Sequence, residues 1–322
     1  WMAVPIALAG MAITRWQAPN RRDPAAGRRL DPLGLLAITF GLGVLVLALI
    51  QGRAWGWGSP LTIGMLVAGL ASLAAVWPIE HRVAHPIIEF DLFRSRSYLG
   101  ATVAAFAMVG AYWAVMYYQP QYLQNVLRYS AVEAGLLILP ITVPMVFLST
   151  VAGRAAVRFG VRPTMTTGMV LGTAGMVLLT RVGGADDYWT TLFPAFLLFG
   201  IALALVYTPM STAAMEALPR TKAGVAAGVL AMNRLLAGSL LLALTGAVFT
   251  RTQTTDATAG PDAAFTDALS RSTWVLVAVM LLGTVGTWLL LKGTQTDATR
   301  DHAATEPPAP QDLHHFATRH QL

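Results

Sequence analysis

Hydrophobic residues in this chain gather into long runs without charge, and short polar segments separate the runs. A helix needs about 20 apolar residues to cross a bilayer, whereas a barrel strand needs only about 10 residues of alternating polarity. The runs are therefore predicted to form membrane-spanning helices. Eight runs are long enough, and they cover residues 32–52, 59–79, 97–122, 134–153, 163–180, 188–215, 223–250 and 272–291.

The two ends of the chain depart from this pattern. The first run, residues 1–14, is shorter than a full span, and it has neither the basic start nor the small-residue cleavage site of a signal peptide. We expect it to be the end of a truncated helix, so that the chain is a C-terminal fragment of a longer protein. Residues 293–322 are polar and proline-rich, which predicts a disordered tail.

The composition agrees with a membrane protein. Only 12% of the 322 residues are charged and 55% are hydrophobic, whereas a soluble domain has about 25% charged residues. The expected fold is therefore all-α and polytopic, with about eight full transmembrane helices and one partial helix. The chain has no cysteine, which excludes disulfides and thiol chemistry.

The 22 arginines and lysines are unevenly distributed along the chain. When the loop at 15–29 is placed inside the cell and the runs alternate, 16 of them fall inside and 5 outside, while Arg234 lies within a run. Cytoplasmic loops carry an excess of Lys and Arg. The chain is thus expected in the plasma membrane, with its C-terminus in the cytoplasm and residues 251–271 outside. The membrane surface explains the basic charge, so no nucleic-acid partner is expected.

The segment GRAAVRFGVRP, residues 153–163, joins two of the runs and is predicted to be a tight cytoplasmic turn. Gly153 and Gly160 allow the backbone to turn closely. Arg154, Arg158 and Arg162 can reach lipid phosphates or the C-termini of nearby helices. One interpretation is a cytoplasmic gating loop, and the alternative is simple anchoring by positive charge.

These two glycines and three arginines resemble the signature loop of the major facilitator superfamily, G-R-x-x-D-R-x-G-R-R. Val157 stands where that family has Asp, and Val161 stands where it often has Arg. The resemblance implies a gating loop. Because the carboxylate is missing, the loop is expected to act as a turn and an anchor rather than as a charge relay.

Other motifs, in the same order along the chain, resemble the fourteen-helix drug:proton antiporters, the EmrB/QacA group of that superfamily. They are Val4-Pro5-Ile6, Asp31-Pro32-Leu33-Gly34, Trp55-Gly56-Trp57, Tyr122-Leu123-Gln124, and the set Gly224, Gly228, Arg234 and Gly238. The resemblance implies two bundles that rock around a central site. It assigns residues 1–30 to the end of the first bundle and a cytoplasmic linker, 31–80 to two inserted helices, 81–96 to a cytoplasmic loop, 97–292 to the second six-helix bundle, and 293–322 to the tail.

Arg234 is a candidate functional residue. It follows Ala223 by 11 residues, which places it about 17 Å along its helix and near the membrane midplane. A charge at that depth costs about 2.5–3.5 kcal/mol and usually faces the bundle interior or a watery cavity. Arg234 is therefore expected to line the substrate cavity or to act in gating. The alternative is a structural arginine that binds helix carbonyls. Asn233 is expected to point to a different face.

A second candidate is an aromatic stripe that consists of Trp113, Tyr117, Gln121 and Gln124. Their spacing places them on one helical face. An aromatic face with amide ends suits flat, lipophilic and partly cationic molecules, and the alternative is the aromatic belt at the membrane interface. Tyr207 is also assigned to the substrate cavity, because a proline two residues later can loosen its helix.

No carboxylate lies in the middle of a run. Proton coupling usually needs a buried acid, so the proton carrier is expected in the missing first bundle. His81 and His85 are spaced like metal ligands, but Pro86 follows and no third ligand is near, so neither a metal nor another cofactor is expected. The sequence contains no phosphate loop, HExxH or GxSxG motif, so no catalytic residue is assigned and an enzyme is not expected.

The function predicted from the sequence is multidrug efflux, the export of lipophilic or cationic small molecules by proton antiport with alternating access. One alternative is export of an endogenous metabolite or antibiotic. A second alternative is a membrane scaffold or sensor that has this fold and does not transport. The expected partners are a small-molecule substrate, protons, the lipid bilayer and the N-terminal bundle of the same protein.

Overall fold

The structure is a computed structural model, and it describes residues 3–17, 32–80, 95–183, 188–216, 223–255 and 260–291. These residues are nearly all helical, and no strand occurs among them, which confirms the all-α fold. Each of the eight predicted runs corresponds to one helix. The helices are α1 (Ala3–Gln17), α2 (Pro32–Trp55), α3 (Pro60–Glu80), α4 (Arg96–Asn125), α5 (Ala131–Phe159), α6 (Val161–Leu179), α7 (Phe193–Glu216) with the π-helical turn η2 (Tyr188–Leu192) before it, α8 (Ala223–Thr255) and α9 (Pro261–Leu290).

Six helical segments in the described part of the chain are long and apolar enough to cross a membrane. The two other predicted spans fall short of this for different reasons. The apolar part of α2, Leu33–Leu49, is shorter than a full span. Helix α6 has 19 residues, and Arg162 and several threonines near its start lower its mean hydropathy. The six segments are Pro60–Ile79, Arg96–Asn125, Ala131–Phe159, Tyr188–Ala214, Ala227–Gln253 and Pro261–Leu290.

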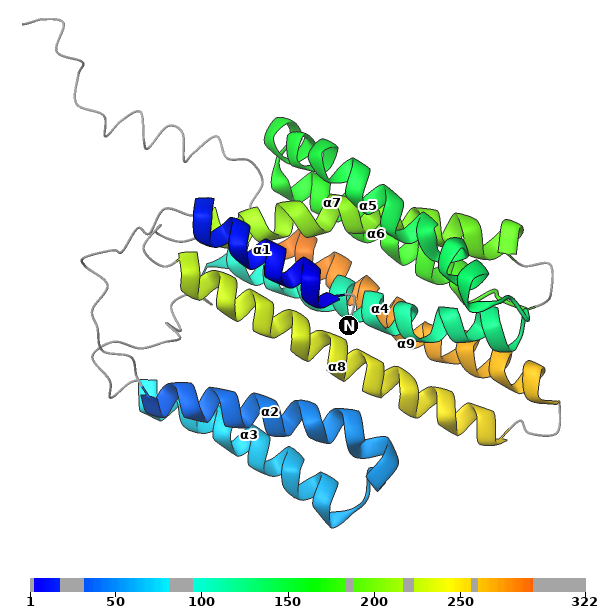
Figure 1. The fold of residues 1–322 in the computed structure, drawn as a ribbon, viewed down its shortest axis with the longest axis horizontal. Coiled ribbons are helices and arrows are strands. Elements are labelled where there is room, and N and C mark those ends of the chain that lie inside the picture. The colour runs from blue at the N-terminus through cyan, green and yellow to red at the C-terminus, as the bar shows by residue number, and fades with distance from the viewer. Residues whose placement is uncertain are drawn as a thin grey trace, which may run out of the picture.

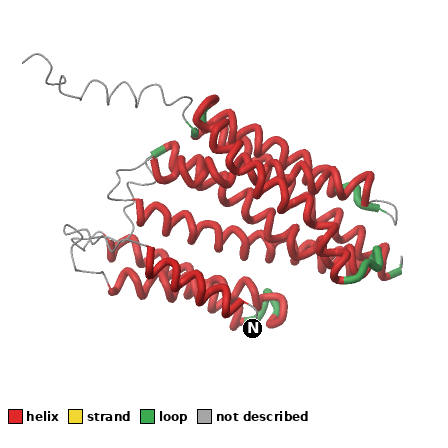
Figure 2. Tube along the Cα trace, turned by 45° about the horizontal axis from the view of Figure 1, so that its top comes forward, coloured by secondary structure: helices red, strands yellow, loops and turns green. Residues whose placement is uncertain are grey.

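Helices α4 to α9 form one bundle, and the α2–α3 hairpin packs beside it against α8 (Figure 1). Among the described connections, residues 56–59 join α2 to α3 and residues 126–130 join α4 to α5, and such loops are green in Figure 2. Helix α4 contacts each of the other five bundle helices and is the most deeply buried of the spans. Its small residues allow this close packing. A Cβ atom at Gly110 would lie only 2.5 Å from Leu241 Cδ1 of α8.

The junction between α5 and α6 is tighter than the sequence predicts. Helix α5 continues to Phe159 and α6 begins at Val161, so Gly160 alone separates them. Gly160 has φ +96°, a left-handed conformation that favours glycine. Gly153 lies inside α5, so its assignment as a turn residue is wrong. The mean hydropathy of the run falls at the first arginine, but the helix itself continues past the apolar segment.

Residues 251–271, which separate two of the predicted runs, are mostly helical in the part that the structure describes. Helix α8 extends to Thr255 and α9 begins at Pro261, directly after Gly260. The polar residues at these ends lie on helical turns, because polar residues can extend a helix beyond its apolar segment. One example is Arg271 in α9, whose Nε lies 3.0 Å from Asp267 Oδ2 one turn earlier.

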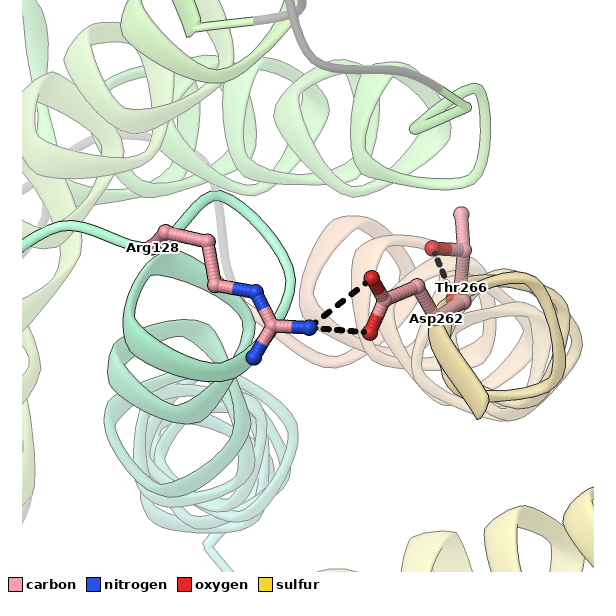
Figure 3. A network of polar contacts seen from close by, with 3 residues as sticks. All are labelled: Arg128, Asp262 and Thr266. Carbon is pink, nitrogen blue, oxygen red and sulfur yellow. Dashed lines mark hydrogen bonds and ion pairs between the residues drawn. The ribbon is translucent and has the colours of Figure 1, made fainter. Parts of the chain in front are cut away.

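An ion pair joins the segment after α4 to the first turn of α9 (Figure 3). Arg128 Nη2 lies 3.0 Å from both Asp262 carboxylate oxygens. The two side chains are 70% and 53% exposed, so the pair contributes at most about 1 kcal/mol. Directly after it, Ser130 and Glu133 form a reciprocal capping box that starts α5.

Several parts of the predicted domain organisation lie outside the described residues. They are most of the cytoplasmic linker before residue 31, residues 81–94 of the following loop with His81 and His85, and the tail at 293–322. Among the residues that are described, no group of three or more His, Cys, Asp or Glu side chains is placed to hold a metal ion.

Candidate functional site

Arg234 of α8 contacts two side chains of α7. Its Nη2 donates a hydrogen bond to Ser211 Oγ at 2.7 Å, and its Nη1 donates a longer one to Tyr207 Oη at 3.4 Å. The guanidinium carbon also lies 4.5 Å from the centre of the Tyr207 ring, within the range of a cation–π contact. The structure therefore brings together two of the residues assigned to the substrate cavity, Arg234 and Tyr207.

Helix α7 positions both partners of Arg234. Tyr207 and Ser211 are four residues apart, so they lie on the same face of the helix. Ser211 Oγ donates a hydrogen bond to the Tyr207 carbonyl oxygen at 3.2 Å, and its oxygen accepts from Arg234 at the same time. The neighbouring Asn233 points elsewhere, as expected, because its Nδ2 donates to the Thr102 carbonyl oxygen of α4 at 3.0 Å.

One nitrogen of the Arg234 guanidinium has no hydrogen-bond partner among the described residues. The side chain is half-buried, and its Nε atom is buried without a hydrogen-bond partner in the described part of the chain. Both side-chain partners, Ser211 and Tyr207, are neutral groups. The positive charge is therefore stabilised by a hydroxyl and a ring face rather than by a carboxylate among the side chains that the structure describes.

Arg234 lies closer to one end of its helix than the sequence suggests. It is the twelfth of the 33 residues of α8, which places it about 8 Å from the helix centre at 1.5 Å per residue. The added turn, residues 251–255, is polar and extends the helix beyond its apolar segment. The position of Arg234 near the membrane midplane therefore stays a prediction.

Two residues of the aromatic stripe, both on α4, lie beside the turns of α8 that follow Arg234. Trp113 of α4 packs on Gly238, where a Cβ atom would lie 2.6 Å from Trp113 Cδ2. Tyr117 lies one turn further along α4 and lines a pocket of about 180 Å³ together with Leu242 of α8 and Trp57. Arg234, Gly238 and Leu242 are spaced by four residues, so these contacts occupy consecutive turns. We call this arrangement the α8 row; it consists of Arg234 with Tyr207, Trp113 on Gly238, and Tyr117 beside Leu242.

The two glutamines of the stripe do not join the α8 row. Gln121 Nε2 donates to the Tyr117 carbonyl oxygen at 2.8 Å, and Gln124 Nε2 donates to the Pro120 carbonyl oxygen at 3.2 Å. Each amide thus binds the backbone of its own helix one turn earlier. Trp113 and Tyr117 are 41% and 48% exposed, so the aromatic part of the stripe presents an open face.

The profile of the Major Facilitator Superfamily matches residues 2–242, which is most of the chain. The chain belongs to the Major Facilitator Superfamily. This confirms the resemblance to that superfamily, and it identifies a multi-pass membrane protein of the transporter type.

Relatives within the superfamily carry names of drug and antibiotic resistance. Multidrug resistance protein Stp of Mycobacterium tuberculosis is 31% identical over 222 residues, which cover 69% of this chain and 41% of the relative. The tetracenomycin C resistance and export protein of Streptomyces glaucescens is 31% identical and covers 76% of this chain and 45% of the relative. Puromycin resistance protein pur8 of Streptomyces alboniger is 30% identical, and the match covers 96% of this chain and 63% of the relative. The chain thus spans between 41% and 63% of the length of these relatives.

A solved structure shows the same fold. The bacterial homologue of the human lysosomal transporter Spinster, in an inward-facing and occupied conformation, superimposes with a TM-score of 0.53. The match covers 82% of this chain and 66% of that chain at 14% sequence identity. At this identity the likeness concerns the fold alone.

In this superfamily member the signature-loop arginines lie apart from Arg234. Arg162 stacks on Trp288 near the end of α9, with its guanidinium carbon 4.0 Å from the ring centre. Arg158 lies 5.3 Å from the ring centre of Phe159, and Arg154 is exposed on α5. Arg162 thus connects the start of α6 to the end of α9, whereas the ring near Arg158 belongs to the next residue of the same helix. The role of the loop as a turn and anchor stays a prediction.

Gly153 links this junction to the α7 side of the site. A Cβ atom at Gly153 would lie 3.9 Å from Cγ2 of Thr208, the residue after Tyr207. The end of α5 therefore lies next to the part of α7 that holds Arg234.

Sequence reasoning missed two residues of the site. Ser211 makes the shorter hydrogen bond to Arg234, and its position four residues after Tyr207 was a signal that could have identified it. Trp57 lines the pocket beside Tyr117 from the α2–α3 hairpin. Nothing in its local sequence indicates that contact, because the packing of the hairpin against the bundle brings the two residues together.

Proposed function

We propose that this chain is the C-terminal half of an exporter of lipophilic or cationic small molecules, which acts by proton antiport with alternating access. The α8 row carries this proposal. It combines an open aromatic face at Trp113 and Tyr117 with a half-buried cation at Arg234. Aromatic faces bind flat cations and lipophilic rings without strict shape requirements. The names of the relatives, multidrug and antibiotic resistance proteins, support this substrate class.

Arg234 has a different role from the aromatic residues in this proposal. A fixed positive charge repels a cationic substrate at close range, so Arg234 is assigned to coupling rather than to direct substrate binding. A cation near a carboxylic acid favours its ionised form and lowers its pKa. We assign that acid to the N-terminal bundle of the whole protein, where it faces Arg234 in one state and releases its proton there.

The proposed orientation follows the distribution of positive charge. The α5–α6 junction and the C-terminus lie in the cytoplasm of a plasma-membrane protein, and the Arg128–Asp262 pair lies outside. A contact supports a common side for the first two, because Arg162 at the junction stacks on Trp288 near the end of α9. The start of α4 lies at the same end, since a Cβ atom at Gly100 would lie 2.9 Å from Leu291 Cγ.

Ethidium efflux from cells that carry the full-length gene tests the proposed function. Energised cells should lower their ethidium fluorescence faster than cells with an empty vector. A protonophore should remove the difference, because it collapses the proton gradient. Efflux that persists with the protonophore would contradict proton antiport, and the absence of efflux at normal expression would contradict the broad substrate class.

Export of an endogenous compound is the second candidate function. The observation in its favour is the relative from Streptomyces glaucescens, which is named a tetracenomycin C resistance and export protein. Deletion of the gene distinguishes the two functions. An endogenous exporter should leave one of the cell's own products inside the deletion strain, while ethidium sensitivity should stay unchanged. A strain that changes in neither respect would support the scaffold or sensor alternative.

A further inference from the structure

A groove runs along the outside of the bundle between α6 and α9, away from the α8 row. Its volume is about 510 Å³, which lies within the usual range of ligand sites. The residues that line it from α6 and the segment after it are Val170, Thr173, Ala174, Val177, Leu178 and Arg181, and those from α9 are Leu281 and Thr284.

The surface of this groove is almost entirely apolar. Its two threonines do not offer free hydroxyl donors, because Thr173 Oγ1 donates to the Met169 carbonyl oxygen and Thr284 Oγ1 donates to the Met280 carbonyl oxygen. The exposed fractions of Val170 and Leu281 are 52% and 51%. A groove with saturated hydroxyls and exposed aliphatic side chains favours a hydrocarbon chain over a polar ligand.

The groove has the length of one membrane leaflet. From Val170 to Arg181 the chain advances 11 residues, or about 16 Å at the helical rise. Half of the hydrocarbon thickness of a bilayer is about 15 Å. An acyl chain that lies along the groove therefore extends from the middle of the bilayer to its surface.

Arg181 marks the end of the groove at the membrane surface. It is exposed, and no carboxylate pairs with it in the part of the chain that the structure describes. This end of α6 is fixed to α9, because Ser270 Oγ donates to the Thr180 carbonyl oxygen. A cation at this height complements the phosphate of a phospholipid.

We propose that the groove between α6 and α9 binds one anionic phospholipid, with an acyl chain along Val170 to Leu178 and the phosphate at Arg181. The apolar walls, the length of one leaflet and the single cation at the surface end all match this ligand. The site is separate from the α8 row, so the proposal does not depend on the transport function.

Native mass spectrometry of the full-length protein tests this site. The protein is released from nanodiscs that contain equal amounts of phosphatidylglycerol and phosphatidylcholine. The wild type should retain one phosphatidylglycerol in preference to phosphatidylcholine. Arg181→Gln should reduce that preference about fivefold, since an arginine near an anionic surface contributes on that scale. Ala174→Trp should remove the bound lipid, because Ala174 is exposed in the groove and the indole fills it.

Arg271→Gln is the matched control. Arg271 is another cation of the same end of the bundle, but it pairs with Asp267 and does not line the groove, so the variant should retain lipid like the wild type. Ala174→Leu serves in place of Ala174→Trp if the latter loses its helical circular dichroism. Three results would overturn the proposal: a wild type without retained lipid, equal retention by the groove-filled variant, or a protein dimer that the groove-filled variant abolishes.

Discussion

Substitutions at Tyr207 separate the contribution of its ring from that of its hydroxyl. The hydroxyl oxygen lies 3.4 Å from Arg234 Nη1, beyond the usual 2.7–3.2 Å of an N–H···O bond. The ring centre lies 4.5 Å from the guanidinium carbon. A cation–π contact contributes about 0.5–1 kcal/mol when exposed and about 2 kcal/mol when desolvated. Because Arg234 is half-buried, we expect about 1–2 kcal/mol from the ring.

Two variants should therefore differ in stability. Tyr207→Phe keeps the ring and should lower the free energy of unfolding by less than about 0.5 kcal/mol, because it loses only a long hydrogen bond. Tyr207→Leu loses the ring and should lower it by about 1–2 kcal/mol through this contact. Reversible unfolding of the full-length protein in mixed micelles measures both values.

A double-mutant cycle isolates the contact from other effects of the leucine. In an Arg234→Ala background, Tyr207→Leu should lose most of its cost, because the cation is absent. Tyr117→Leu is the control, since Tyr117 has no contact with Arg234 among those that the structure shows. Equal costs for Tyr207→Phe and Tyr207→Leu would refute the ring contact, and so would a cost of Tyr207→Leu that is the same in both backgrounds.

Three further predictions concern packing, orientation and completeness. Gly200→Ala should lower stability by about 1–3 kcal/mol, because its Cβ would lie 2.5 Å from the Ile141 carbonyl oxygen; Gly228→Ala, with no atom within 4 Å, should be neutral or stabilising in the same thermal assay. Membrane-impermeant maleimide applied from outside should label Val132→Cys and spare Val157→Cys, which lie at opposite ends of α5 and are 73% and 81% exposed; the reverse labelling would contradict the proposed orientation. Vesicles that contain this chain alone should show no proton-dependent efflux, because alternating access needs two bundles; efflux there would refute the two-bundle account.

The sequence predicts the helices well and their ends less well. Charge-free runs identify the segments that lie in hydrocarbon, and each run corresponds to a helix. The end of a helix depends on backbone geometry rather than on hydropathy. Helix α5 therefore continues past Arg154 and Arg158 and ends only at Gly160, whose φ of +96° breaks it.

The candidate site shows a similar limit. The sequence identifies which residues are unusual, but it does not predict which of them are in contact. A charge in an apolar run was sufficient to identify Arg234, and spacing was sufficient to identify the face with Trp113 and Tyr117. Arg234 and Tyr207 are 27 residues apart in sequence and lie on different helices. Periodicity within one helix contains no information on such a contact between helices. Spacing also does not predict that the exposed amide of Gln121 binds the Tyr117 carbonyl one turn earlier, because that hydrogen bond depends on the side-chain conformation.

The most direct test of the account is proton-driven ethidium efflux by Arg234 variants of the full-length protein in inverted membrane vesicles. Arg234→Ala removes both the charge and the contacts with Tyr207 and Ser211, and it should abolish coupled transport while expression persists. Arg234→Lys keeps the charge without the planar fork and should retain part of the activity. Transport by Arg234→Ala at the wild-type rate would contradict the account and leave Arg234 with a packing role only.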